Sequence, residues 1–276
     1  MEFSNSLIFI CFFTFVIHMT EALAYSMRLA GVRTRQIAVA MAFVTSTLLV
    51  SRLSNMFQAP LLGLMVDNAI IQGSSSSLNV LEGQFRFIIL FAFFGALMGA
   101  FLTPTAVFLF QKAIRNFQHS GSIPILVFSA LKPATFVKIV KSFRFPNIGS
   151  LKTISIKSLP KGFLVFNVFV TSIYVIGVLC SLLAGAYLPE YRSTAIQLSG
   201  IVNGMATIMF TIFVDPPGAR VTDQAVNGVR DENDVRSVVF FMQLGKMFGI
   251  FVLAQLFLRP FSNYIMWVTE LIKEVF

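Results

Sequence analysis

The chain has 276 residues, of which 56% are hydrophobic and only 12% are charged, and its formal net charge is +9. Because soluble domains carry about 25% charged residues, this composition excludes a soluble globular protein and indicates an integral membrane protein. In such a protein, anionic lipid headgroups rather than nucleic acid are the expected partner of the positive charge. No cofactor is expected.

Six apolar stretches approach the length of about 20 residues that a helix needs to cross a bilayer. They predict an all-α, polytopic integral membrane protein with about six transmembrane helices. No segment of soluble-domain composition remains, so we expect residues 1–276 to form a single transmembrane domain. The predicted spans are residues 5–27, 36–56, 87–111, 162–187, 194–214 and 237–258.

The first span carries polar side chains at intervals of three or four residues. At about 100° per residue these positions lie within one stripe about 80° wide on the helix. An ionisable group inside the bilayer is costly, so His18 and Glu21 should face a cavity or a partner. An ion pair from Glu21 to Arg28 or to Lys246 that only joins helices is the simpler alternative. The residues of the stripe are Thr14, His18, Glu21, Tyr25 and Arg28.

Polar residues also mark the end of the second span, where Arg52, Asn55 and Gln58 lie close together. An Arg guanidinium can bind two phosphate oxygens at once, so Arg52 is a candidate site for an anionic headgroup. Alternatively, Arg52 extends toward the lipid headgroups without binding a substrate.

A basic loop follows the third span. Residues 112–161 contain nine Lys and Arg, and no acidic residue occurs between Glu82 and Glu190. Under the positive-inside rule this loop is cytoplasmic, and both the N- and the C-terminus are predicted to lie outside. Within it, residues 123–145 mix apolar and basic side chains, which is typical of a segment that lies on a membrane surface. It would bind anionic membrane lipids or the headgroup of a lipid-linked substrate.

The later spans contain two polar residues of interest. Asn203 needs a hydrogen-bond partner or a water-filled cavity at its position in the fifth span. Lys246 in the sixth span is flanked by Gly245 and Gly249, which allow close helix approach. Pairing with Glu21 and a role in a substrate or ion relay are both consistent with this position.

The two halves of the chain show a faint internal symmetry. Asp67 follows Pro60 by seven residues, and Asp223 follows Pro216 by the same interval. Three predicted spans lie on each side of the basic loop, so the second half must enter the membrane in the opposite sense. This arrangement predicts a three-plus-three inverted repeat of the kind found in secondary transporters.

Several function classes lack their sequence motifs in this chain. There is no Walker A loop, HExxH or GxSxG motif, and no acidic run with metal-binding spacing, so an ATP-driven pump within the chain is excluded. The cysteines, Cys11 and Cys180, fall within spans and lack metal-ligand spacing. A passive or gradient-driven transporter, an intramembrane lipid-modifying enzyme and a non-transporting scaffold remain.

Three segments carry a family resemblance: residues 18–34, residues 51–63 with Val66-Asp67, and Val214-Asp215-Pro216 with the downstream Asp223. Over essentially its full length the chain resembles the bacterial Amj family, the alternate lipid II flippases. The resemblance implies a multi-pass protein of the bacterial cytoplasmic membrane that is not an enzyme. It would translocate lipid II, the undecaprenyl-pyrophosphate-linked peptidoglycan precursor, from the inner to the outer leaflet for cell-wall synthesis.

The resemblance and the residue pattern together suggest roles for the polar side chains. In this hypothesis, arginines neutralise the pyrophosphate, which lowers the cost of moving its charge through a low dielectric. The candidate substrate-binding residues are Arg28, Arg33, Arg52, Asn55, Gln58 and Asn203. A polar core or coupling group would comprise His18, Glu21, Lys246, Asp67 and Asp215. The driving force, the oligomeric state and the lipid selectivity stay open at the level of sequence.

Overall fold

The computed structural model describes residues 5–122, 132–147, 149 and 152–275, and these described residues form helices and turns without any strand. Six helical stretches are long and apolar enough to cross a bilayer, which confirms the predicted all-α polytopic fold. These stretches are Asn5–Thr34, Ile37–Gln72, Ser75–Phe101, Lys161–Tyr187, Pro189–Val226 and Glu232–Val275.

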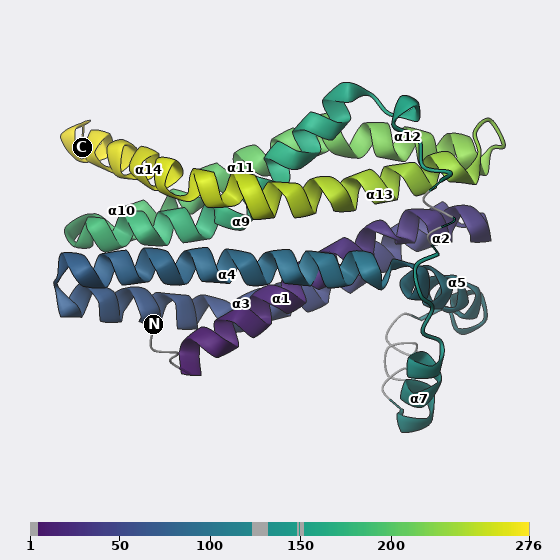
Figure 1. The fold of residues 1–276 in the computed structure, drawn as a ribbon, viewed down its shortest axis with the longest axis horizontal. Coiled ribbons are helices and arrows are strands. Elements are labelled where there is room, and N and C mark those ends of the chain that lie inside the picture. Colours follow the sequence, from purple (N-terminus) through teal and green to yellow (C-terminus); the bar gives the residue numbers. More distant parts are fainter. Residues whose placement is uncertain (1–4, 123–131, 148, 150–151, 276) are drawn as a thin grey trace.

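The first half of the chain is a three-span unit. Its first span comprises α1 (Asn5–Tyr25) and, after a break at Ser26, α2 (Met27–Thr34). The second and third spans are α3 (Ile37–Gln72) and α4 (Ser75–Phe101). The spans alternate in direction along the long axis of the molecule, and α1 packs against both α3 and α4 (Figure 1).

The second half repeats the count of three spans but interrupts two of them. The fourth span of the chain is the continuous helix α9 (Lys161–Tyr187). The other two are divided by π-helical turns, which loosen the regular hydrogen-bond ladder and often lie at functional sites. Their elements are η2 (Pro189–Tyr191), α10 (Arg192–Gln197), α11 (Ser199–Met209), η3 (Phe210–Val214) and α12 (Asp215–Val226), then α13 (Glu232–Phe248), η4 (Gly249–Ala254) and α14 (Gln255–Val275).

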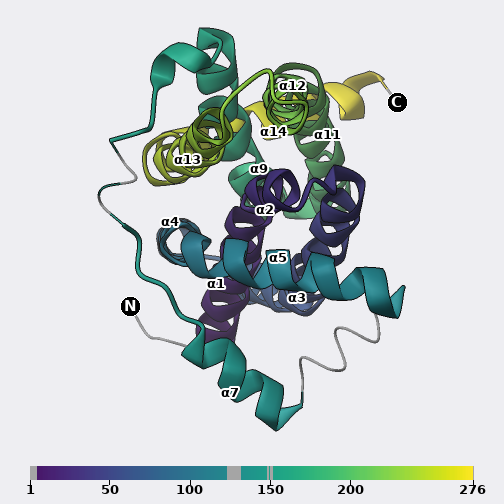
Figure 2. The same cartoon turned by 90° about the vertical axis from the view of Figure 1, so that its right-hand side faces the viewer.

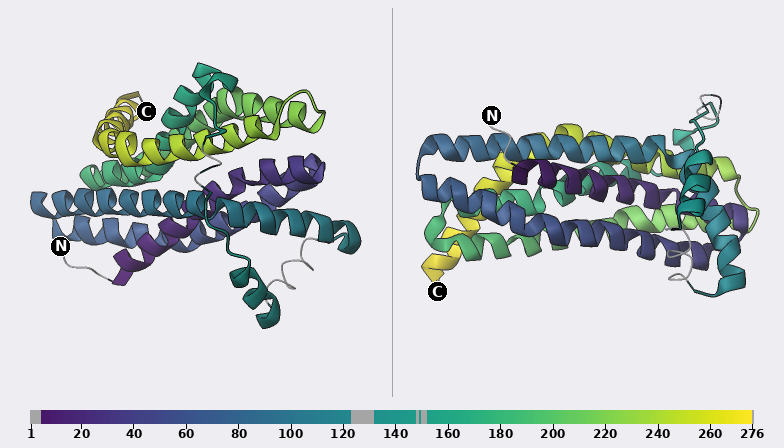
Figure 3. Two further views of the ribbon diagram at one scale, coloured as in Figure 1. Left: turned by 45° about the vertical axis from the view of Figure 1, so that its right-hand side comes forward. Right: turned by 90° about the horizontal axis from the view of Figure 1, so that it is seen from below.

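The two halves form two layers that face one another along the whole length of the bundle (Figures 1 and 3). Each half has three spans, so the second half runs in the opposite sense to the first. That relation satisfies the topological requirement of an inverted repeat, whereas the repeat itself stays a prediction.

One end of the molecule carries the basic loop. Helix α5 (Thr103–Ser120) runs across this end of the bundle, and α7 (Pro133–Lys141) and the short η1 (Ile156–Ser158) follow (Figure 2). We call it the basic end, and the α3–α4 turn lies at the opposite end. Residues 123–131 of the predicted membrane-surface segment lie outside the described residues.

The predicted bounds of the third span were wrong. The expected helix over residues 87–111 is instead α4, which starts at Ser75, and it ends at Phe101. Pro104 lies in the first turn of the new helix α5, where its missing N–H is tolerated, whereas inside a continuous helix it would remove a hydrogen bond. The chain therefore turns at Leu102 and leaves the bundle.

Other predicted span ends were too early as well, including that of the sixth span, which continues from residue 258 to Val275. The second span continues from residue 56 to Gln72 because Pro60 is accommodated inside α3, on an exposed face. The fifth span does not end at residue 214, since Asp215 opens another helical segment, α12, with Pro216 in its first turn. In these places apolar or helix-compatible residues extend beyond the stretch of highest hydropathy.

Glycines allow α1 and α4 to approach closely. A Cβ atom on Gly95 would collide with the backbone of Phe15, and one on Gly99 would lie 2.6 Å from the Cβ of Ala22. Small residues at such crossings let helix backbones touch, which is the main source of packing energy between helices in a bilayer. This contact fixes the position of the α1 polar stripe.

We therefore expect Gly95→Val to destabilise the protein by about 1–3 kcal/mol, because the added side chain overpacks the α1–α4 contact. Thermal unfolding of the purified protein in detergent would measure this. Gly83→Val is the matched control, because Gly83 is on the same helix and has open space around it. Equal melting temperatures for the two variants would contradict the assignment of this contact.

Candidate functional site

An ion pair between the two halves lies in the middle of the molecule. Lys246 on α13 donates a hydrogen bond to Oε2 of Glu21 on α1, and Nδ1 of His18 lies 3.4 Å from the same oxygen. Ser51 on α3 donates to the other carboxylate oxygen at 3.3 Å. The Lys246 side chain is only 5% exposed and that of Glu21 34% exposed. Of the two partners that the sequence left open for Glu21, the structure selects Lys246.

Lys246 reaches this position because α13 and η4 lie close to α9. A Cβ atom on Gly245 would collide with the amide of Asn167, and one on Gly249 with the backbone of Val168. Asn167 donates to the carbonyl oxygens of Phe241 and Met242 at 3.2 and 3.1 Å. Asn167 was not predicted as a site residue, although an amide within an apolar span was a usable signal.

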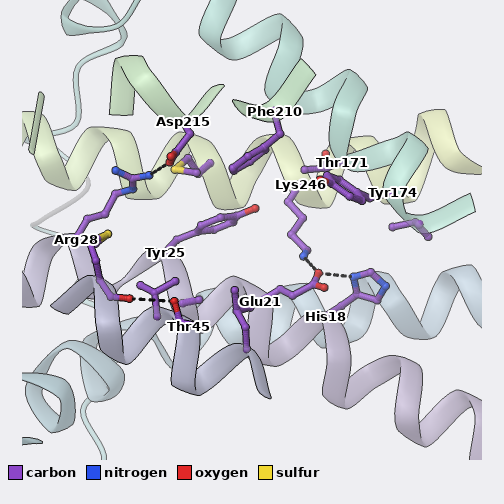
Figure 4. A pocket seen from close by; sticks show the side chains of 16 residues that line it. His18, Glu21, Tyr25, Arg28, Thr45, Thr171, Tyr174, Phe210, Asp215 and Lys246 are labelled. Carbon is purple, nitrogen blue, oxygen red and sulfur yellow. Dashed lines mark hydrogen bonds and ion pairs between the residues drawn. The ribbon is translucent and has the colours of Figure 1, made fainter. Parts of the chain in front are cut away.

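A first cavity of about 500 Å³ extends from this ion pair toward the basic end. Arg28 and Asp215 form a second ion pair across the halves at its other extremity, and Tyr25 lies between the two pairs (Figure 4). The charge of the buried Arg28 is thus compensated by the Asp215 carboxylate on α12. The cavity therefore brings together five of the predicted site residues: His18, Glu21, Arg28, Asp215 and Lys246.

Asp215 follows a weak point in the fifth span. The π-helical turn η3 ends at Val214, and Pro216 and Pro217 follow Asp215 without backbone N–H groups. Carbonyl groups in the preceding turn therefore lose donors. Because Phe210 at the start of η3 also lines the first cavity, bending at this turn would change the cavity wall.

A second cavity of about 330 Å³ lies on the other side of the Glu21–Lys246 pair, toward the opposite end. His18 and Glu21 line both cavities. The other predicted site residues in the wall of the second cavity are Arg52, Asn55, Gln58 and Asn203. The polar stripe of the first span is thus divided, with Thr14 on α1 lining the second cavity and Arg28 on α2 lining the first.

The polar groups of the second cavity are unequally satisfied. Gln58 donates to the hydroxyl of Thr14 and, at 3.4 Å, to the carbonyl oxygen of Ile10. Oδ1 of Asn203 is buried without a hydrogen-bond partner. Arg52 and Asn55 are exposed and form no hydrogen bond or ion pair with the described part of the chain. An uncompensated guanidinium beside an unsatisfied amide is suited to an anionic, hydrogen-bonding ligand.

Two predicted site residues lie apart from these cavities. Arg33 donates to Oε1 of Glu232 at 3.0 and 2.7 Å near the basic end. Asp67 pairs with Arg192 on α10 and lines neither cavity. Neither residue therefore belongs to the central group around Glu21 in this conformation.

Ion pairs join the halves at both ends as well as in the middle. The ion pair between Glu82 and Arg259 was not predicted from the sequence. The Glu82 carboxylate also pairs with Arg86, one helical turn away. Within the described chain, no group of three or more His, Cys, Asp or Glu gathers in a way that could hold a metal ion. Among the described residues, the ion pairs between the halves are Arg28–Asp215, Arg33–Glu232, Glu21–Lys246, Asp67–Arg192 and Glu82–Arg259.

Two three-span halves, with polar cavities on both sides of one buried ion pair, define a multi-pass membrane protein of the transporter class. The chain belongs to the Amj family, because the sequence model of that family, described as "Alternate to MurJ", matches residues 13–269. A curated relative named Lipid II flippase Amj, from Bacillus subtilis (strain 168), is 35% identical over 268 residues, 97% of this chain and 98% of the relative. No solved structure matches the chain. The resemblance noted in the sequence is thereby confirmed.

The Glu21–Lys246 pair predicts a strong energetic coupling between two spans. Removing either partner leaves the other charge uncompensated. The losses of unfolding free energy in Glu21→Gln and Lys246→Met should therefore add up to more than the loss in the double variant. In a double-mutant cycle of unfolding free energies in detergent, we expect a coupling of about 1–3 kcal/mol.

A parallel cycle on Arg230 and Asp234 serves as the control, because this pair is 3.9 Å apart and lies within one half, between the turn that precedes α13 and its first turn. Its expected coupling is below about 0.5 kcal/mol. If the Glu21–Lys246 cycle also fell below that value, the pair would not be a principal contact between the halves.

Proposed function

We propose that this chain moves lipid II from the inner to the outer leaflet of the bacterial cytoplasmic membrane and does so without changing the lipid chemically. Family membership and the name of the Bacillus subtilis relative support this substrate. The observation that carries the proposal is the pair of cavities on opposite sides of Glu21 and Lys246, between two three-span halves, each with charged and polar side chains in its wall. A path for a charged headgroup needs polar walls at membrane depth.

The pyrophosphate is the part of lipid II that is costly to move through the membrane. Arg52 in the second cavity is the available cation for it, with Asn55, Gln58 and Asn203 as neutral hydrogen-bonding groups. Arg28 in the first cavity is held by a carboxylate, so the pyrophosphate would replace Asp215 as its anionic partner. Arg33 lies apart from both cavities and is paired with Glu232, so it lies outside this path.

The positions of the ion pairs support an alternating mechanism. Arg28–Asp215 and Arg33–Glu232 hold the halves together toward the basic end, and Asp67–Arg192 and Glu82–Arg259 do so at the opposite end. Opening one set while the other stays closed would expose the two cavities in turn. The π-helical turns η3 and η4 would absorb the bending, and His18, Glu21 and Lys246 would exchange partners in the centre.

We further propose that the basic end faces the cytoplasm and that both termini lie outside, as the positive-inside rule indicates. The native cysteines are buried and give low background in labelling. An impermeant maleimide added to intact cells should label Glu274→Cys near the C-terminus. Lys138→Cys on α7 should react only after lysis. The reverse pattern would invert the proposed orientation.

The transport proposal predicts that outside lipid II depends on this protein and on Arg52. Cells whose other flippases are shut off would be probed with an impermeant toxin that cleaves exposed lipid II. We expect Arg52→Gln to reduce cleavage about tenfold or more, because hydrogen bonds to a charged phosphate are lost. Arg115→Gln, which removes an exposed charge on α5, should retain it.

Other results would favour the remaining alternatives. A change in the mass of the lipid would indicate an intramembrane lipid-modifying enzyme, for which His18, Glu21 and Asp67 would be acid–base candidates. Full cleavage with Arg52→Gln at matched protein levels would support a non-transporting scaffold. Cleavage that does not depend on expression of the folded protein would refute the flippase proposal.

A further inference from the structure

A third cavity, of about 290 Å³, lies at the basic end and is separate from the proposed transport cavities. Its described lining contains the three arginines Arg33, Arg144 and Arg236 and no carboxylate, while much of the remaining wall is apolar, including Val107 and Val239. A cavity that combines several guanidinium groups with an apolar wall matches a ligand that has an anionic head and a hydrocarbon tail.

The backbone contacts of Arg144 hold it in this cavity. Its N–H donates to Oγ1 of Thr105 at 2.9 Å, and the same hydroxyl donates to its carbonyl oxygen at 3.3 Å. Its guanidinium lies 3.8 Å from the centroid of the Phe108 ring. Arg144 forms no ion pair with the described residues, so its charge is positioned but uncompensated.

The other two arginines share one carboxylate. Oε1 of Glu232 accepts from Arg33 at 2.7 Å and from Arg236 at 3.1 Å. Arg236 also donates to Oγ1 of Thr153 and Oδ1 of Asn233 at 3.2 and 3.0 Å. Three guanidinium groups against a single carboxylate leave a net charge of +2 around the cavity, which favours a phosphate group.

An exposed aromatic cluster adjoins the cavity. The rings of Phe101, Phe143 and Phe145 lie within 4.9 to 6.2 Å of one another, centroid to centroid. Phe145, which also lines the cavity, is 75% exposed. On a membrane protein, an exposed apolar patch of this kind is suited to contact with lipid. The cluster therefore offers an apolar surface for an acyl chain that continues from the cavity.

A polar barrier separates this cavity from the first one. Gln243 on α13 lines the third cavity and donates to Oγ1 of Thr103 at 2.6 Å and to the carbonyl oxygen of Ala22 at 3.0 Å. Lys246 lines the first cavity and is absent from the described lining of the third. A ligand in the third cavity would thus occupy a site of its own.

We propose that the third cavity binds the phosphate headgroup of an anionic phospholipid, with Arg144 and Arg236 contacting the phosphate oxygens. An acyl chain lies along Phe101 and Phe145. This site differs from the loose surface attraction expected of the basic loop, because its arginines are held by side-chain and backbone contacts within the fold. It does not depend on which lipid the protein transports.

The test measures binding of dioleoylphosphatidylglycerol to the purified full-length protein in detergent by native mass spectrometry. Arg144→Gln combined with Arg236→Gln should weaken binding at the tightest site about tenfold or more, because charged hydrogen bonds are lost. Lys138→Gln combined with Lys141→Gln removes the same charge from α7 and should change binding less than about twofold. Dioleoylphosphatidylcholine should bind this site weakly in every variant.

A further variant keeps the result interpretable if the arginine variants fail to fold. Ala100→Phe fills the apolar side of the cavity without changing its charge and should also weaken phosphatidylglycerol binding. Equal losses in the α7 control and the arginine variant would overturn the proposal in favour of a diffuse basic surface. Displacement of the lipid by an equal concentration of inorganic phosphate would show that the site recognises free phosphate and would also overturn it. Unchanged phosphatidylglycerol binding in Ala100→Phe would also overturn the proposal.

Discussion

The buried ion pair between Glu21 and Lys246 constrains much of the structure around it. Inside a bilayer neither charge can be left alone, so α1 and α13 must stay in register although they belong to different halves of the chain. Gly245 and Gly249 let α13 approach α9 closely enough to place the ammonium group there. Gly95 and Gly99 similarly fix α1 against α4. Close packing within each half thus serves a polar contact between the halves.

Charged contacts are a principal feature of the interface between the halves. Lipid tails are as apolar as leucine side chains, so apolar contacts alone give little preference for one helix arrangement over another in a membrane. Ion pairs at the two ends and in the centre instead specify how the layers meet. Such contacts have discrete partners, and a phosphate-bearing ligand can compete for the arginines among them. The same groups can therefore stabilise the resting conformation and respond to a substrate.

Much of the fold could be predicted from local properties of the sequence. Hydropathy located all six spans, and the 3.6-residue period predicted that Thr14 to Arg28 share one face of the first span. The predicted span bounds were wrong where helix continuity depended on proline. Pro104 begins a new helix after a turn, whereas Pro60 is accommodated within α3. Hydropathy averages over a window and cannot distinguish these two cases.

Only the tertiary structure decided which polar residues meet. Glu21 pairs with Lys246 across 225 positions of the chain and Arg28 with Asp215 across 187, although Glu21 and Arg28 share one face of the first span. The fold also distributes the candidate residues between two cavities and places Asp67 with Arg192 at the opposite end. Periodicity and hydropathy describe how one helix presents its own side chains. Partner choice depends on how separate helices are packed, and that information is not local.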